Sequence, residues 1–322
     1  MRAVMYHYVR PVADRPPNGY YRLELSDFRR QLDRLERAFD VLDRTRLLAV
    51  LRGDAPPPDD GLVLTFDDGL LDHHEWVFPE LRRRGLCGVF FVSTGPLDGQ
   101  VLPVHRVHSL LGSHPTDRVR EALLATMDER GVAADGGGST DTYRSDAVRD
   151  VEDDPAAHAA AVKRLVNFEL PPESVPGLLD AVESRLGATT PSADAYYLSE
   201  TGLRDLDDAG MVVGAHTVTH PVLSRLSVAA QRREIRDSFD RLEEVVGPLD
   251  VRPFAYPYGG PETFTDATEE LLADADCDVA FTTVSGAFDG DDVRDRPFAL
   301  PRQDCNEFPH GDASFDVSVS GE

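Results

Sequence analysis

Short apolar runs alternate with amphipathic helical patterns along most of this chain, and this alternation limits the folds open to it. The apolar runs occupy residues 62–66, 88–92, 211–215, 253–256 and 279–283. The helical patterns between and around them occupy residues 25–39, 75–84, 198–209, 227–246 and 265–275. A buried strand that is followed by a helix and another buried strand forms a βαβ unit, whose two strands are parallel. We therefore expect an α/β fold built on a parallel sheet.

The alternation is interrupted between about residues 100 and 195. Four helical patterns fall in this stretch, at residues 107–111, 119–127, 156–168 and 175–186. Residues 131–154 are small, acidic and rich in Gly and Ser, which is typical of a mobile loop. We expect a single domain over residues 1–322 that carries a helical insertion, or lid, at about 100–195. The acidic tail, residues 310–322, is expected to be flexible.

The charge balance excludes two classes of partner. The 322-residue chain has 58 acidic against 33 basic residues, a formal net charge of −25, and its single lysine is Lys163. A surface this acidic disfavours nucleic acid and anionic membranes. The same composition is typical of adaptation to high salt, where self-repulsion is screened.

Cellular location and cysteine chemistry are constrained by what the sequence lacks. No apolar run approaches the ~20 residues of a membrane span, and the first residues lack the apolar region of a signal peptide. We therefore expect a cytoplasmic protein. Cys87, Cys277 and Cys305 are far apart and form no CxxC motif, so neither a disulfide framework nor a thiolate zinc site is predicted.

Two adjacent carboxylates, Asp67 and Asp68, follow the run at 62–66 and precede Gly69. Two like charges at a strand end repel each other unless positive charge lies beside them, and a divalent metal is one source of it. The pair carries no weight alone, because four further Asp-Asp pairs occur in this acidic chain. Its significance depends on partners elsewhere in the sequence.

A pair of histidines four residues apart, His216 and His220, follows the apolar run at 211–215. The β-branched residues between them and the proline after them argue against a regular helix and for a turn at a strand end. Taken alone, such a pair is more often an ordinary hydrogen-bonded turn than a metal site. Because the carboxyl ends of parallel strands meet at one face, we expect the histidines to lie near the Asp pair. Two histidines and one carboxylate suit Zn²⁺ or Fe²⁺ and leave positions open, while the second Asp is free to act as a base.

Three motifs together resemble the first three motifs of the polysaccharide deacetylases, the NodB-homology domains of carbohydrate esterase family four. The motifs are Thr65-Phe66-Asp67-Asp68-Gly69, His216-Thr217-Val218-Thr219-His220 and Pro257-Tyr258-Gly259. The resemblance covers residues 60–95 and 196–303. It implies a distorted (β/α) barrel with fewer than eight strands, and metal-dependent removal of acetyl groups from an N-acetylated sugar or glycan precursor. It implies nothing about oligomeric state.

The resemblance also implies roles for single residues. Asp67 is expected to be the catalytic base, and the expected metal ligands are Asp68, His216 and His220. The expected metal is Zn²⁺, with Co²⁺, Mn²⁺, Ni²⁺ and Fe²⁺ as alternatives. The backbone N–H of Tyr258 is expected to stabilise the oxyanion, in a loop shaped by Pro257 and Gly259.

The sequence departs from the family pattern at the support of the base. Many members have an arginine two residues before the proline of the third motif, where this chain has Ala255 in Phe254-Ala255-Tyr256-Pro257-Tyr258-Gly259. Leu300-Pro301-Arg302 fits a variant in which a later arginine takes this place. We hypothesise that Arg302 contacts Asp67 and keeps it ionised.

The general acid is not identified by a family motif, because the Asp/Trp and Leu-x-His motifs are not visible in this chain. His105, at the start of the insertion, is the first candidate. His108 and His7 are the others, whereas His310 is too near the tail to favour.

Three alternative functions stay open on the sequence alone. The same barrel and metal set could hydrolyse another amide or a cyclic imide. A two-His-one-carboxylate site also occurs in Fe²⁺ oxygenases, although the ligand spacing here favours the deacetylase. A non-catalytic carbohydrate-binding relative is the third.

Overall fold

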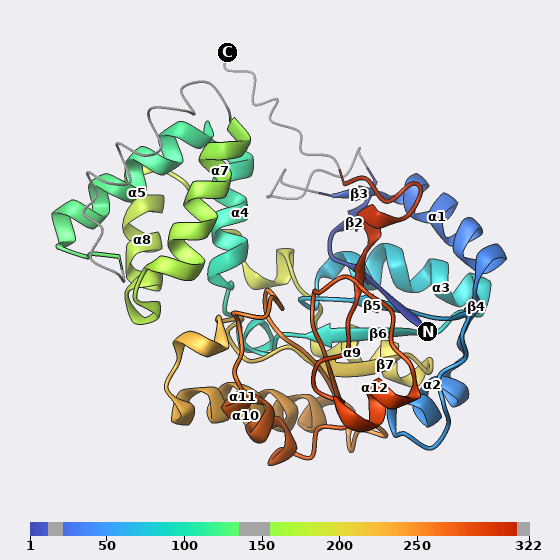
Figure 1. Ribbon diagram of the computed structural model, residues 1–322. Helices are drawn as coiled ribbons and strands as arrows, with labels where there is room; N and C mark the ends of the chain where they lie inside the picture. Colours follow the sequence, from blue (N-terminus) through green and yellow to red (C-terminus); the bar gives the residue numbers. More distant parts are fainter. Residues whose placement is uncertain (12–21, 135–154, 314–322) are drawn as a thin grey trace. The chain divides into compact units, whose positions relative to one another are not determined.

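The computed structural model describes residues 1–11, 22–134 and 155–313 (Figure 1). The chain divides into two compact units, which are described separately. In the described chain, the first unit comprises residues 1–11, 22–100 and 193–313, and the second comprises residues 101–134 and 155–192. Most of the loop predicted at 131–154 and the tail beyond residue 313 lie outside the described residues.

The first unit is built on a sheet of parallel strands, as the alternation predicted. Its strands are β1 (Arg2–Tyr6), β4 (Asp40–Val41), β5 (Gly61–Phe66), β6 (Gly88–Val92), β7 (Val212–Ala215), β8 (Pro253–Ala255), β9 (Val279–Phe281) and β10 (Gln303–Asp304). The order β10-β1-β5-β6-β7-β8-β9 forms a continuous path of seven strands in the described chain, and β4 pairs beside β5 off this path. A second, two-stranded sheet joins β2 (Val9–Arg10) to β3 (Leu23–Glu24).

The last segment of this path joins its two edges. Gln303 and Asp304 of β10 pair with β1, and Leu300 forms a parallel bridge with Phe281 of β9. The sheet therefore curls into a distorted barrel, which confirms the predicted fold class.

Helices of the first unit surround the sheet (Figure 1). They are α1 (Leu25–Ala38), α2 (Arg44–Leu51), α3 (Phe78–Arg84), α9 (Glu200–Asp208), α10 (Val228–Val246), α11 (Asp266–Ala273) and α12 (Gly290–Asp295). A π-helical turn (His73–Val77) precedes α3. Strand β5 is buried along its whole length, and its side chains alternate between two apolar clusters. Phe66 packs in a cluster with α1 and α10, whereas Val63 packs in one with Phe91 and Phe281.

The second unit consists of helices with an apolar core of their own. The helices are α4 (Pro103–Ser113), α5 (Thr116–Arg130), α7 (Pro155–Arg164) and α8 (Val175–Leu186), with a π-helical turn (Leu165–Glu169) after α7. Helix α5 packs against both α7 and α8. That this segment is an insertion in one domain stays a prediction. Among the described helices of the chain, none combines the length and the apolar character that a membrane span needs.

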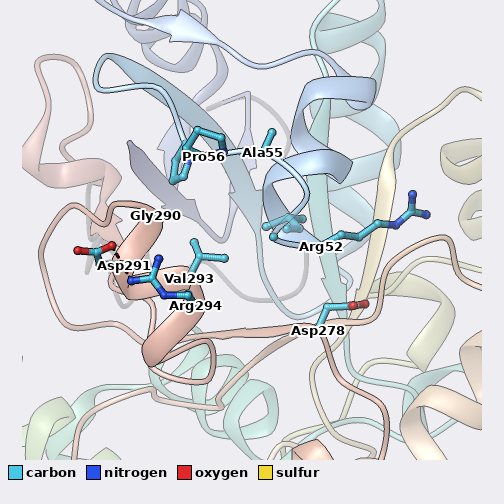
Figure 2. Close-up of a pocket in the computed structure, with 11 residues that line it drawn as sticks. Arg52, Ala55, Pro56, Asp278, Gly290, Asp291, Val293 and Arg294 are labelled. Atoms are coloured by element: carbon cyan, nitrogen blue, oxygen red, sulfur yellow. Dashed lines mark hydrogen bonds and ion pairs between the residues drawn. The ribbon is translucent and has the colours of Figure 1, made fainter.

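A cavity of 570 Å³ opens in the first unit near the amino ends of the strands (Figure 2). Its walls come from the end of α2, the loop before β5, the residue before β9 and α12; they include Arg52, Pro56, Asp278 and Arg294. Parallel strands place their carboxyl ends at the opposite edge of a sheet. The cavity is therefore distant from the motif residues that follow β5 and β7.

Candidate active site

Asp68, His216 and His220 offer three potential ligand atoms that all lie within 4.8 Å of one another. The Nε2 atom of each histidine is 3.3 Å from Oδ1 of Asp68. Atoms bonded at about 2.0–2.1 Å to one tetrahedral metal ion are about 3.3 Å apart. All three side chains are buried. The donor types, and the distance of each histidine from Asp68, fit a small divalent cation.

The loop after β5 directs its two carboxylates to different partners. Asp68 (φ 78°) and Gly69 (φ 64°) are successive residues in the left-handed region, so the chain turns sharply where the strand ends. A Cβ on residue 69 would lie 2.8 Å from Cγ1 of Val92, which explains the glycine. Asp68 faces the two histidines, whereas Asp67 pairs with Arg302.

Asp67 and Arg302 form a bidentate ion pair inside the barrel. Nη1 and Nη2 of Arg302 each donate to a different oxygen of Asp67, both at 2.7 Å. The Nε of Arg302 donates to the carbonyl of Thr282 at 3.0 Å, and the arginine side chain is 0% exposed. The hypothesised contact between Asp67 and Arg302 is therefore present. Its part in catalysis stays a prediction.

This ion pair decides the charge of the buried carboxylate. Burial alone would raise the pKa of Asp67, because a charge is poorly solvated in the interior. The positive charge of Arg302, with a smaller contribution from His216, outweighs burial and lowers the pKa of Asp67 below its ordinary value. The carboxylate is therefore ionised at neutral pH, as a general base must be.

The orientation of His216 is fixed by a backbone contact. Its Nδ1 lies 2.7 Å from the carbonyl oxygen of Ala255, which accepts a hydrogen bond only if Nδ1 carries the proton. That tautomer leaves the lone pair on Nε2, the atom that faces Asp68. Ala255, where many family members have arginine, thus contributes its carbonyl group.

The His216–His220 loop is a non-helical turn with two strained residues. Thr217 (φ 64°) and His220 (φ 59°) are both in the left-handed region. The hydroxyl of Thr217 accepts a hydrogen bond from the N–H of His220 at 3.0 Å, which closes the turn. This side-chain bond replaces the backbone bonds that a helix would supply.

The Pro257–Gly259 loop lies beside the second histidine. The rings of Tyr258 and His220 meet edge to face with centroids 4.9 Å apart. Tyr258 and Gly259 both have φ 64°, and a Cβ on residue 259 would lie 2.6 Å from Thr283. Burial, with the charge of Asp68, raises the pKa of Tyr258 and keeps it a neutral phenol. Oxyanion stabilisation by the Tyr258 N–H stays a prediction.

Backbone strain is concentrated in the three motif loops. The described chain has six non-glycine residues with positive φ, and four of them are Asp68, Thr217, His220 and Tyr258. Such conformations persist only where surrounding contacts enforce them, and they cluster at functional sites. The strain adds an independent reason to place the site at these loops.

The candidates for the general acid are divided between the two units. His105 is fully buried on α4 of the second unit, with its ring 5.8 Å from that of His108. His7 follows β1 in the first unit, and its carbonyl lies 3.0 Å from Nε2 of His73. His310 is exposed. The assignment of His105 as general acid stays a prediction.

Glu234 of α10 contacts the site and carried no signal in the sequence. Its carboxylate accepts hydrogen bonds from the loop between His216 and His220. It is one position from the buried stripe that contains Ile235, and helical periodicity alone gives such a position no contact with a distant loop. Only the path of the loop, which periodicity does not encode, brings the two together.

Comparison with known proteins agrees with the fold and motifs. Residues 183–280 match the family model for polysaccharide deacetylase, a range that contains the histidine loop and the Pro257–Gly259 loop but not Asp67 or Asp68. The peptidoglycan-N-acetylmuramic acid deacetylase PdaC of Bacillus subtilis is 34% identical over 130 residues, which is 39% of this chain. The chain spans 25% of the length of this relative.

Two solved structures share the fold. The Streptococcus pyogenes deacetylase PplD in complex with acetate has a TM-score of 0.54 and 17% identity, covering 94% of this chain and 91% of that one. IcaB from Ammonifex degensii has a TM-score of 0.53 and 18% identity, again covering 94% and 91%. Residues 183–280 therefore carry a polysaccharide deacetylase match, shared in part with PdaC, and the chain has the barrel fold of these two solved structures.

Proposed function

We propose that this protein is a metal-dependent hydrolase that removes the acetyl group from an N-acetylated sugar of a glycan or glycan precursor. The observation that carries the proposal is the convergence of Asp68, His216 and His220 beside an ionised, arginine-held Asp67. This set combines a place for a cation with a separate base, and metal-assisted amide hydrolysis uses both.

The metal expected at Asp68, His216 and His220 is Zn²⁺, with Co²⁺, Mn²⁺, Ni²⁺ and Fe²⁺ as alternatives. When bound, a divalent cation supplies Lewis acidity, which lowers the pKa of water and polarises an amide carbonyl. Asp67 accepts the proton of the attacking water. Arg302 holds both oxygens of Asp67, so the base keeps its charge and its direction.

The remaining steps need an oxyanion donor and an acid. The N–H of Tyr258 donates to the oxygen that becomes negative when water adds to the acetyl carbon. The C–N bond then breaks, acetate leaves, and an acid protonates the departing amine. His105 is the first candidate for that acid. His7 is the second, because it follows β1 at the same edge of the sheet as Asp67.

The comparisons support the choice of substrate class. The name of PdaC describes deacetylation of N-acetylmuramic acid in peptidoglycan, and PplD was solved with acetate. An N-acetylated glycan is therefore the substrate class that we propose for this chain. Which sugar it prefers depends on loops that the motifs do not specify.

The decisive experiment measures metal content and acetate release together on a panel of N-acetylated sugars. We expect one divalent ion per chain, acetate release in the parent, and loss of both metal and turnover in His216→Ala. Asp67→Asn is the matched variant: we expect it to keep the metal and lose turnover by about 10²–10⁴-fold.

Other outcomes would each replace the proposal with a different function. Hydrolysis of a cyclic imide without acetate release would identify the alternative amide hydrolase. Oxygen uptake during turnover would identify an Fe²⁺ oxygenase. Metal and sugar binding with no product in any assay would identify a non-catalytic relative.

A further inference from the structure

Glu234 makes three hydrogen bonds to the segment between the two histidines. Its Oε2 accepts from the backbone N–H groups of Val218 and Thr219, both at 2.9 Å. Its Oε1 accepts from the hydroxyl of Thr219 at 2.7 Å. Both carboxylate oxygens are thus committed to one short loop.

The opposite, carbonyl side of this loop is held by the segment that follows β6. The hydroxyl of Ser93 donates to the carbonyl of His216 at 2.8 Å. The N–H groups of Thr94 and Gly95 donate to the carbonyls of Thr217 and Val218, at 3.1 and 2.9 Å. The loop is therefore fixed from two sides, with Glu234 holding its amide side.

The strain in the loop explains why such fixing is needed. Thr217 is β-branched and has φ 64°, a conformation that is unfavourable for its residue type. His220 has φ 59°. Strained backbone persists only where the surroundings enforce it, so losing the amide-side contacts should let the loop relax. Any relaxation between positions 216 and 220 changes the separation of the two imidazoles.

Glu234 is well placed to hold the loop because its helix is anchored. Helix α10 begins at the Ser227 N-cap, whose side chain accepts from the N–H of Ala230. Ile235 and Phe239 are fully buried in the core beneath it. The carboxylate therefore projects from a rigid element, and rigid support is what a metal centre requires of its surroundings.

We propose that Glu234 is a positioning residue that sets the separation of His216 and His220 and thereby the metal affinity of the site. Glu234 is not itself a ligand. The inference rests on the proposed metal centre, because it assigns Glu234 a role toward that centre.

The test compares the Zn²⁺ affinity of the parent with Glu234→Ala, Glu234→Gln and the control Glu244→Ala. Glu244 lies on the same helix with its side chain 69% exposed. We expect Glu234→Ala to bind Zn²⁺ about 10–100-fold more weakly, the usual cost of losing an outer-shell partner. Glutamine can accept both N–H bonds with its carbonyl and donate to Thr219 with its amide, so Glu234→Gln and Glu244→Ala should bind as the parent does.

A second measurement tests the rigidity of the loop in metal-free protein. Hydrogen exchange of the Val218 and Thr219 amides should accelerate in metal-free Glu234→Ala and stay slow in Glu234→Gln. Thr219→Val removes one of the three bonds from the loop side, and it should weaken Zn²⁺ binding by less than Glu234→Ala does. This variant also tests the proposal if Glu234→Ala fails to fold.

Three results would overturn the inference. Parent-like Zn²⁺ affinity in Glu234→Ala would show that the contacts do not set the site. Equal weakening in Glu234→Gln and Glu234→Ala would assign the effect to charge instead of position. A parent that binds no divalent ion would overturn the proposed metal centre and this role with it, whereas the first two results leave the metal centre intact.

Discussion

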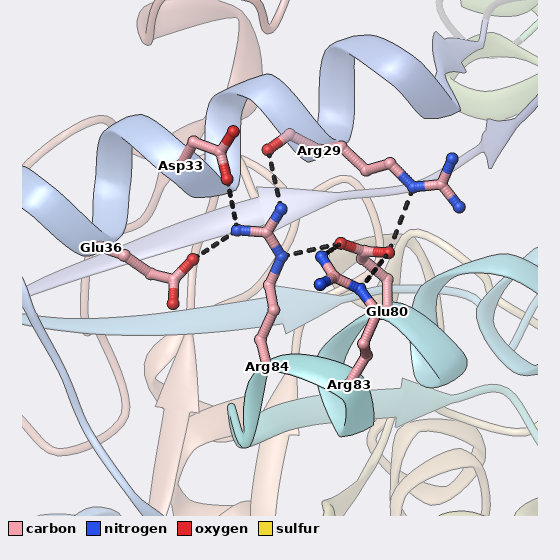
Figure 3. Close-up of polar contacts among 6 residues, drawn as sticks. All are labelled: Arg29, Asp33, Glu36, Glu80, Arg83 and Arg84. Carbon is pink, nitrogen blue, oxygen red and sulfur yellow. Dashed lines mark hydrogen bonds and ion pairs between the residues drawn. The ribbon is translucent and has the colours of Figure 1, made fainter.

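Two arginine–carboxylate assemblies in the first unit use the same chemistry in opposite surroundings. In the first assembly, the side chain of Asp67 is 2% exposed and that of Arg302 is 0% exposed. Each carboxylate oxygen of Asp67 accepts a hydrogen bond from a nitrogen of Arg302. The second assembly, the α1–α3 network, contains Arg29, Asp33, Glu36, Glu80, Arg83 and Arg84 (Figure 3). Its centre is largely buried, with Glu80 4% and Arg84 10% exposed, whereas Arg29 is 52% and Arg83 is 63% exposed.

The two assemblies differ in redundancy. Glu80 accepts from Arg29, Arg83 and Arg84, and Arg84 also donates to Asp33, so that losing one member leaves others in place (Figure 3). Asp67 relies on Arg302 for the ion pair that offsets its burial. Redundant, exposed contacts serve to join α3 to α1, whereas a single buried pair sets the state of one functional group.

The pKa values of the two carboxylates show the same difference. Hydrogen bonding, first from Arg83 and then from Arg84 and Arg29, lowers the pKa of Glu80 to about 2 against a weaker opposing effect of burial. For Asp67, burial is the largest influence and would raise the pKa, so Arg302 must first offset it. Loss of the arginine of the buried pair should therefore lower the free energy of unfolding far more than loss of one arginine of the network.

The largest expected effect is that of Arg302→Met. The variant leaves Asp67 buried without its cation, so we expect the free energy of unfolding to fall by about 3–5 kcal/mol, measured by urea denaturation. The double variant Arg302→Met/Asp67→Asn removes the uncompensated charge and should recover part of that loss. A double variant no more stable than Arg302→Met would contradict the importance of the pair.

A gentler change to the same pair should alter turnover. Arg302→Lys keeps a positive charge but loses the fork that contacts both oxygens of Asp67. Because the lysine offsets the effect of burial less than Arg302 does, the pKa of Asp67 should rise. The acidic limb of the kcat/KM profile should then move to higher pH. An unchanged limb together with unchanged turnover would show that Arg302 does not support the base.

Glu80→Gln should have a smaller effect, confined to stability. We expect a loss of about 1–2 kcal/mol near neutral pH, because charge-assisted hydrogen bonds become neutral ones. The folded-state pKa is lowered from 4.5 to about 2, so this contribution is present above about pH 4.5 and disappears as pH falls through about 2. The free energy of unfolding of the variant should therefore fall less steeply than that of the parent as pH falls through this window. Its acetate release at neutral pH should match that of the parent.

The parts of the site that the sequence predicted are those that lie at strand ends. Asp68 follows β5 and His216 follows β7, and the parallel sheet brings such positions to one edge whatever the intervening chain does. Arg302 was found through a family resemblance and not through physical pattern, because it lies 235 residues from Asp67. The two-residue strand β10 beside it is too short for periodicity to detect.

Other parts were out of reach for different physical reasons. Glu234 meets its loop across a tertiary contact that a helical pattern does not contain. His105 was singled out because it begins the helical segment, and the structure adds only that it is buried within α4. Sequence periodicity locates elements and their faces, whereas the pairing of distant side chains depends on how the loops run.

The smallest expected effect is that of Arg29→Ala at high ionic strength. Arg29 is one exposed partner of Glu80, and such pairs contribute about 0.2–1 kcal/mol at low salt. In 1 M salt the Debye length falls to ~3 Å, so the loss of stability in Arg29→Ala should become undetectable by urea denaturation, whereas that in Arg302→Met should persist because buried pairs are screened little. Adaptation to high salt stays a prediction from the net charge of −25; at high salt the exposed contacts would contribute least to stability, and the buried pair would contribute fully. If 1 M salt reduced the stability loss equally in Arg29→Ala and Arg302→Met, burial would not be what distinguishes the two assemblies.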